Sequence, residues 1–198
     1  MISVDEAKWT WGMMFDPGKF TKKRMSIGDA LGFYYRLVIV PLIISLILGA
    51  LVGVAASALL SHFVGILGFL GGLGTAAIAI GVVAMLLLVV IPIGMFISAA
   101  VLHFFGKYVF RQFKSDYQAT FAAVVYGEAP LVLFFWITII PVIGLLYIVI
   151  DIWGFIVEVF ALSNLQRTSK LSVVGVMIGT IVVIFVIAII LGIIGVLA

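Results

Sequence analysis

Residues 75–105 read TAAIAIGVVAMLLLVVIPIGMFISAAVLHFF, without one Asp, Glu, Lys or Arg. As a helix this segment would extend about 46 Å, more than the roughly 30 Å of a bilayer's hydrocarbon core. It therefore has to tilt, kink at Pro92 or protrude. The whole chain of 198 residues is 66% hydrophobic and 10% charged, whereas a soluble domain is about 25% charged. The sequence predicts an all-α integral membrane protein.

Further apolar segments flank this one, and together they predict a bundle of five transmembrane helices. The predicted spans are residues 37–60, 75–105, 117–138, 141–164 and 171–197. The uncharged, glycine-rich residues 61–74 are left between two spans, either as a loop or as a re-entrant segment. The chain then divides into a cytoplasmic or interfacial segment, 1–36, and a transmembrane domain, 37–198.

The amino-terminal segment carries helix signals of its own. Ser3 and Glu6 form a capping-box pattern, which predicts a helix over residues 4–15. Its Trp, Met and Phe side chains favour an amphipathic helix in the headgroup region of a membrane. Asp16-Pro17-Gly18 ends that helix, and Ser26 with Asp29 predicts the start of the next.

The basic residues predict the orientation. They fall in three groups, before the first span, between the second and third, and between the fourth and fifth: Lys8, Lys19, Lys22, Lys23, Arg24 and Arg36; Lys107, Arg111 and Lys114; Arg167 and Lys170. By the positive-inside rule the amino terminus lies in the cytoplasm and the carboxyl terminus outside. We expect a multi-pass protein of the cell membrane.

Two features point to partners. The basic cluster of Lys19, Lys22, Lys23 and Arg24 suits anionic lipids or a protein on the cytoplasmic side. The GxxxG patterns Gly49/Gly53 and Gly175/Gly179 favour close helix contacts, either within one chain or in a homo-oligomer.

Three carboxylates, Glu128, Asp151 and Glu158, stand in apolar stretches without a Lys or Arg. Each costs on the order of 2.5–3.5 kcal/mol near the bilayer centre. If the chain turns at residues 139–140, Glu128 and Asp151 are equidistant from the turn and lie at one depth near the midplane. Glu158 follows on the same helix face, closer to the cytoplasm, within reach of a basic partner: Arg111, Lys114 or Arg167.

The pair of Glu128 and Asp151 has three interpretations, because two facing carboxylates cannot both be charged there without a cation. They are protonated and hydrogen-bonded, share one proton, or bind a cation through oxygen ligands. Tyr126, Tyr147 and the helix kink at Pro130 are candidate supports. Structural and functional roles both stay open.

Other chemistry finds no pattern in the sequence. The chain has no Cys, and the predicted topology puts His62 and His103 near opposite membrane surfaces. The glycines of residues 68–74 match neither nucleotide-binding fingerprint, and no protease motif is present. We therefore expect no enzyme, no cofactor, no metal site and no nucleic-acid partner.

The five-span plan, Phe15-Asp16-Pro17-x-x-Phe20 and Tyr126-Gly127-x-x-Pro130 together resemble the Yip family of Ypt/Rab-interacting membrane proteins. The resemblance implies a cytoplasmic amino terminus and, from the eukaryotic members, a link to Rab GTPases and vesicle traffic. This chain has little cytoplasmic mass and only a loose Asp16-Pro17-Gly18 version of the family's motif, which indicates a prokaryotic member. The expected function is a non-enzymatic scaffold or adaptor in membrane organisation or trafficking. The alternative is a proton- or cation-coupled transporter or channel that uses Glu128 and Asp151.

Overall fold

The computed structural model describes residues 4–139 and 143–197, and the regular structure of these residues is helical throughout. The elements are α1 (Val4–Phe15), α2 (Pro17–Phe20), α3 (Ile27–Val64), α4 (Ile66–Met85), η1 (Leu86–Val90), α5 (Ile91–Phe104), η2 (Phe105–Val109), α6 (Tyr117–Leu133), η3 (Phe135–Ile139), η4 (Ile143–Leu146), α7 (Tyr147–Gln166) and α8 (Lys170–Leu197). The all-α prediction is confirmed for this part of the chain. So is the predicted first helix, although Ser3 of its capping box lies outside the described residues.

Four helical segments of the described chain are long and apolar enough to cross a membrane. They are Ile27–Leu59, Ile80–Val109, Ile143–Gln166 and Lys170–Leu191. The predicted third span is not among them, because α6 has 17 residues and gives way to the 3-10 helix η3 after Leu133. A count of five spans therefore stays a prediction.

Residues 61–74 do not form an extended loop. Helix α3 continues to Val64, Gly65 alone makes the turn with φ of 67°, and α4 begins at Ile66. Glycine suits the turn because a positive φ is costly for other residues. Glycine, which interrupts soluble helices, is common in membrane helices. The two helices therefore extend beyond the ends of the predicted spans, and the span boundaries themselves stay a prediction.

The predicted disturbance at Pro92 takes the form of a π-helical turn, η1. The N–H of Ile91 donates to Leu86 O, and Pro92 has no N–H to offer the next carbonyls. Two hydroxyls from α3 take over: Tyr34 donates to Leu87 O at 2.5 Å and Tyr35 to Leu88 O at 3.3 Å. The widened turn therefore ties α3 to α5.

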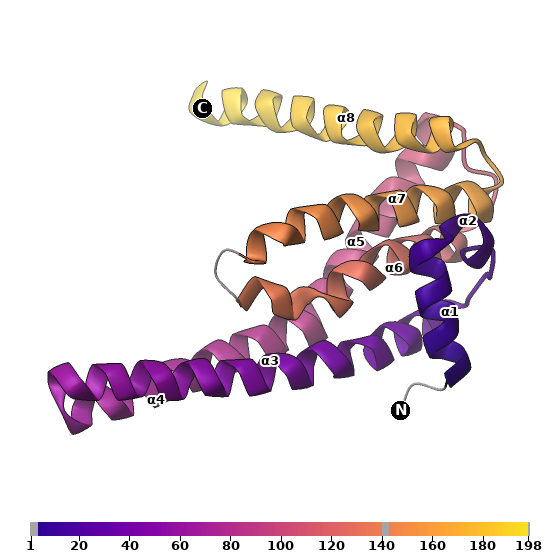
Figure 1. Cartoon of the computed structure of the whole chain (residues 1–198). Coiled ribbons are helices and arrows are strands. Elements are labelled where there is room, and N and C mark those ends of the chain that lie inside the picture. Colours follow the sequence, from indigo (N-terminus) through magenta and orange to yellow (C-terminus); the bar gives the residue numbers. More distant parts are fainter. Residues whose placement is uncertain (1–3, 140–142, 198) are drawn as a thin grey trace.

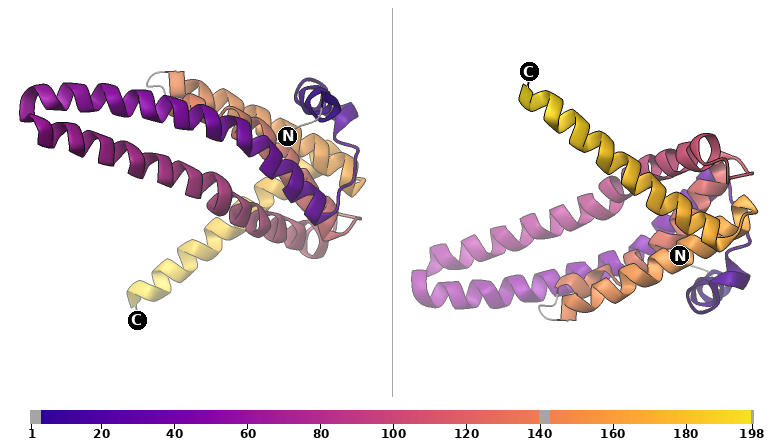
Figure 2. Two further views of the ribbon diagram at one scale, coloured as in Figure 1. Left: turned by 90° about the horizontal axis from the view of Figure 1, so that it is seen from below. Right: turned by 90° about the horizontal axis from the view of Figure 1, so that it is seen from above.

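The segments that carry the basic residues gather at one end of the molecule (Figures 1 and 2). Helix α1 crosses that end at a steep angle to the long helices, beside the start of α3. The connections from η2 to α6 and from α7 to α8 lie there too, whereas the α3–α4 turn and the carboxyl end of α8 point the other way. We call this the basic end.

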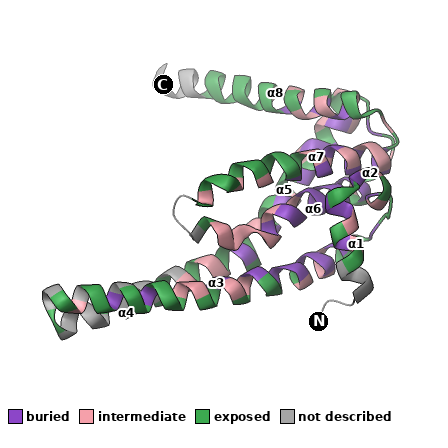
Figure 3. Cartoon of the chain, viewed as in Figure 1, coloured by how far each residue is buried: buried purple, intermediate pink, exposed green. Residues whose placement is uncertain are grey.

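Helix α6 forms the centre of the packed core. Figure 3 shows buried residues over α6 and the adjoining parts of α3, α5 and α7, next to α1. Away from the basic end, large apolar side chains such as Leu51, Ile78 and Phe185 are exposed. An exposed apolar surface of this extent is typical of helices that face lipid.

Each of the two GxxxG patterns contains a glycine that packs within the chain. A Cβ on Gly49 would lie 3.2 Å from Ile80 of α4, and one on Gly179 would lie 2.6 Å from the ring of Phe110. A Cβ on Gly175 would meet open space. The homo-oligomer stays a prediction.

Candidate functional site

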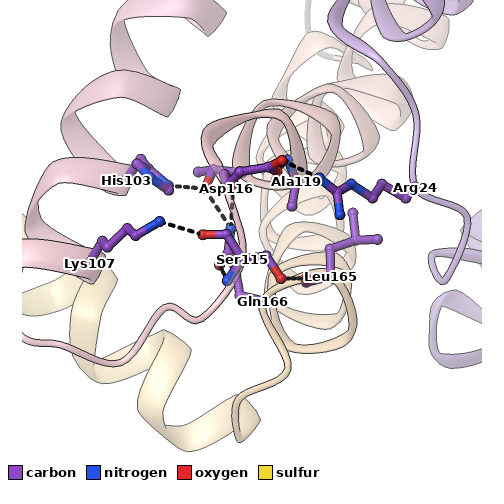
Figure 4. Close-up of polar contacts among 9 residues, drawn as sticks. Arg24, His103, Lys107, Ser115, Asp116, Ala119, Leu165 and Gln166 are labelled. Carbon is purple, nitrogen blue, oxygen red and sulfur yellow. Dashed lines mark hydrogen bonds and ion pairs between the residues drawn. The ribbon is translucent and has the colours of Figure 1, made fainter.

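A buried hydrogen-bond network joins three helices at the basic end (Figure 4). Gln166, the last residue of α7, is fully buried. Its Nε2 donates to Thr120 Oγ1 at 2.8 Å and to Asp116 O at 3.2 Å, and its Oε1 accepts from the Ser115 N–H at 2.9 Å. One amide thus holds the start of α6 against the end of α7.

The same network extends to α5 and to the linker before α3. His103 Nδ1 and Thr120 Oγ1 share a hydrogen bond of 2.8 Å, and Lys107 Nζ donates to Ser115 O at 3.2 Å. Asp116 caps α6 by accepting from the Ala119 N–H at 3.2 Å and forms an ion pair with Arg24. Sequence reasoning missed Gln166 and Thr120, although a polar amide among apolar residues is a signal for an internal partner.

The amino-terminal segment is bonded to the bundle by side chains from distant parts of the chain. Tyr126 OH on α6 donates to Lys23 O at 2.6 Å. Asn164 Nδ2 on α7 donates to Gly18 O at 3.2 Å and to Thr21 Oγ1 at 3.0 Å. These bonds satisfy backbone groups of a short connecting segment and fix its path.

Aromatic packing gives α1 an inner and an outer face. The Trp9 ring meets Phe33 and Tyr126 edge to face, with centroids 5.1 Å and 5.3 Å away. On the outer face, Trp11 and Phe15 stack on each other and are 53% and 75% exposed. Such an exposed aromatic pair suits the headgroup region of a membrane.

A pocket of about 490 Å³ lies between α1, the linker before α3 and the first turns of α3. Its walls include Trp9, Lys23, Arg24, Asp29, Phe33 and Arg36. Of the basic cluster predicted from the sequence, Lys23 and Arg24 line this pocket. The exposed Lys19 and Lys22 are not among its lining residues. Arg36, which belongs to the same amino-terminal group of basic residues but not to the predicted cluster, lines the pocket as well.

The intramembrane acids come together around Glu128. The partly buried Glu128 on α6 is within electrostatic range of both Asp151 and Glu158 on α7. Asp151 is exposed on the outside of the bundle, and no hydrogen bond joins it to Glu128 in the described residues. The sequence predicted Glu128 and Asp151 as a pair but expected a basic partner for Glu158. A functional role of the three acids stays a prediction.

The basic partner expected for Glu158 is not found. Arg24 forms an ion pair with Asp116 and not with Glu158, and the electrostatic neighbour of Glu158 is Glu128. Glu158 points toward α6: a Cβ on Gly127 would lie 2.6 Å from Glu158 Cβ and 3.3 Å from its Oε2. Its side chain is therefore directed across the helix interface toward Gly127.

The candidate supports differ in position. Tyr147 lies within electrostatic range of Glu128 and Asp151, and its OH donates to Leu131 O at 3.0 Å. Tyr126 instead points to Lys23. Pro130 lies inside α6 near its carboxyl end, and its carbonyl accepts from the Phe134 N–H at 3.2 Å. Across the described residues no group of three or more His, Asp or Glu side chains is arranged to hold a metal ion.

Close approach of α6 and α7 depends on two glycines. A Cβ on Gly154 would lie 2.7 Å from Gly127 O and would also overlap the Leu131 side chain. The helices meet at this point with almost no side chain between them, as small residues allow in membrane helix pairs. The contact falls beside the acids and holds Glu128 near Glu158.

These apolar helices define an integral membrane protein. The family model of the Yip1 domain matches residues 11–193 of the chain, which therefore belongs to the Yip family. No curated protein and no solved structure matches it. The two segments that carried the family resemblance meet in the fold, because Tyr126 bonds to the linker that follows Phe20.

Proposed function

We propose that this Yip-family protein is a non-enzymatic scaffold or adaptor in membrane organisation or trafficking, and that the folded amino-terminal segment is its contact surface. In the proposed topology five helices cross the cell membrane and the basic end faces the cytoplasm. The observation that carries the proposal is the docking of residues 16–24 by Tyr126 and Asn164. A segment fixed in this way presents one defined surface.

The exposed side of that surface combines aromatic and basic groups. Trp11 and Phe15 point outward from α1, and Lys19 and Lys22 are exposed on the connecting segment. Aromatic and basic side chains together suit a partner that binds at the membrane surface. The partner would be a cytoplasmic protein, and the helical bundle would anchor the resulting complex to the bilayer.

The transport alternative has no comparable support. Asp151 is exposed on the outer side of α7, so the two acids do not enclose a site between the helices. The described pocket belongs to the basic end and is lined by none of the three acids. The described contacts therefore give no support to a proton or cation shared between Glu128 and Asp151.

The experiment places a photo-crosslinking amino acid at Trp11 or Lys22 in native membranes. Ile181, an exposed residue on α8 outside the segment, is the matched control site. The proposal expects a discrete crosslinked product from the first two sites and lipid alone from Ile181. Asn164→Ala should weaken the product by releasing the segment. Glu128→Gln and Asp151→Asn should leave it unchanged.

Two results would contradict the proposal. One is loss of the crosslinked product in Glu128→Gln while the circular dichroism and elution volume of the purified protein stay those of the wild type. The other is a flux of protons or cations through liposomes that contain the purified protein. If Glu128→Gln abolishes that flux, the result supports the transporter.

A further inference from the structure

The structure assigns a second role to the basic end: we propose that the pocket between α1 and α3 binds the phosphate headgroup of an anionic phospholipid. This inference requires that the chain lie in a membrane and is independent of the scaffold function. It rests on the charge of the pocket, its apolar wall and its place along α3.

The charge of the lining favours an anion. Among the lining residues that the structure describes, three are basic, Lys23, Arg24 and Arg36, and one, Asp29, is acidic. Asp29 already accepts a hydrogen bond from Ser26 Oγ at 2.7 Å at the start of α3. Guanidinium groups bind phosphate oxygens in a forked geometry, so this set of residues suits a phosphate group.

Arg24 pairs with Asp116, and this ion pair is compatible with binding. Both side chains are about half exposed, at 55% and 49%. An exposed ion pair contributes little to stability. A phosphate that enters the pocket can therefore share the guanidinium of Arg24 or displace the carboxylate at small cost.

The rest of the wall favours a lipid over a free phosphate ion. Trp9 and the buried Phe33 close one side of the pocket, and an inorganic phosphate would gain nothing from aromatic rings. A phospholipid presents its glycerol backbone next to the phosphate, and this part matches an apolar wall. The volume of about 490 Å³ is in the range of small-molecule sites.

The position along α3 places the pocket at headgroup depth. Ile39 is the first exposed aliphatic side chain of α3 after Arg36, and it follows Arg36 by about 4.5 Å along the helix axis. Tyr35, exposed beside Arg36, has the side chain that is enriched at membrane interfaces. The basic residues thus stand just outside the apolar surface, at the level of the lipid phosphates.

Native mass spectrometry of the purified full chain in detergent tests the proposal, with phosphatidylglycerol titrated against phosphatidylcholine. We expect one tight phosphatidylglycerol site. Lys23→Gln with Arg36→Gln should weaken it by about tenfold or more, because each basic residue at an anionic surface contributes roughly fivefold in affinity. The matched control, Lys19→Gln with Lys22→Gln, removes the same charge outside the pocket and should change the affinity by less than about twofold.

Equal losses in the two double variants would overturn the proposal, because they would indicate diffuse attraction to the basic end. Displacement of phosphatidylglycerol by equimolar inorganic phosphate or glycerol 3-phosphate would overturn the lipid as occupant. If the Arg36→Gln variant does not fold, the test uses Lys23→Glu, which changes an exposed residue. An affinity for phosphatidylglycerol equal to that of the wild type in this variant would contradict the proposal.

Discussion

The phenol of Tyr126 donates a hydrogen bond of 2.6 Å to the backbone carbonyl of Lys23, 103 residues earlier in the chain. Its ring also packs edge to face on Trp9. One side chain at the centre of α6 thereby holds both α1 and the linker to α3.

Tyr126→Phe should loosen the linker while it keeps the aromatic packing. The loss of one hydrogen bond costs about 0.5–1.5 kcal/mol, so the linker should open roughly two- to tenfold more often. Trypsin cleavage after Lys22, Lys23 and Arg24, which are exposed, measures the opening.

Tyr35→Phe is the matched control, because its hydroxyl bonds to Leu88 O away from the linker. Equal cleavage rates in wild type and Tyr126→Phe would contradict the docking role of Tyr126.

Gln166→Leu should destabilise the bundle strongly. The substitution removes the side-chain partner of the Ser115 N–H and one of the two partners of Thr120 Oγ1, which keeps its bond to His103. A buried polar group left unpaired costs about 1–3 kcal/mol. We expect a clearly lower Tm in detergent, followed by circular dichroism. Gln112→Leu, at an exposed residue, should leave the Tm near that of the wild type, and a similar drop in both variants would contradict the network's importance.

Gly154→Ala should separate α6 from α7. The new Cβ would lie 2.7 Å from Gly127 O, a backbone atom that cannot turn away, and overpacking of this kind costs about 1–3 kcal/mol. Gly175→Ala is the contrasting substitution, because its Cβ would enter open space; it should leave stability unchanged or raise it by up to about 1 kcal/mol. Thermal unfolding of both variants measures the difference, and a destabilised Gly175→Ala would indicate a contact with a second copy.

Two substitutions at Asp116 should distinguish the contribution of its helix cap to stability from the contribution of its ion pair with Arg24. Asp116→Asn retains an oxygen for the Ala119 N–H and loses the charge opposite Arg24, so it should cost at most about 1 kcal/mol. Asp116→Ala loses the cap as well and should cost about 0.5–2 kcal/mol more. Unfolding at low and high salt checks the assignment: the wild type should lose stability with salt relative to Asp116→Asn. A salt response shared by the two proteins would rule out a contribution from the ion pair.

Several features of the fold could be predicted from sequence because local chemistry decides them. The class of membrane protein follows from composition, and the break at Asp16-Pro17 follows from the missing N–H of proline and the Asp16 side chain, which accepts from Lys19 N. Ser26 starts α3 by accepting from the Asp29 N–H at 3.1 Å. The helical structure of residues 61–74 was not predicted, because glycine interrupts helices in soluble proteins but is common in membrane helices.

The sequence by itself determined the helical membrane class, the first helix, the start of α3 and the grouping of basic residues, since each depends on composition or on neighbours within about one helical turn. Only the tertiary structure decided that Tyr126 bonds to Lys23, that Glu158 points at Gly127, and that Arg36 joins Lys23 and Arg24 around one pocket. These relationships depend on which face of α6 meets α1, α3 and α7. Apolar membrane helices give no strong sequence signal for that choice, because most of their surface is equally hydrophobic.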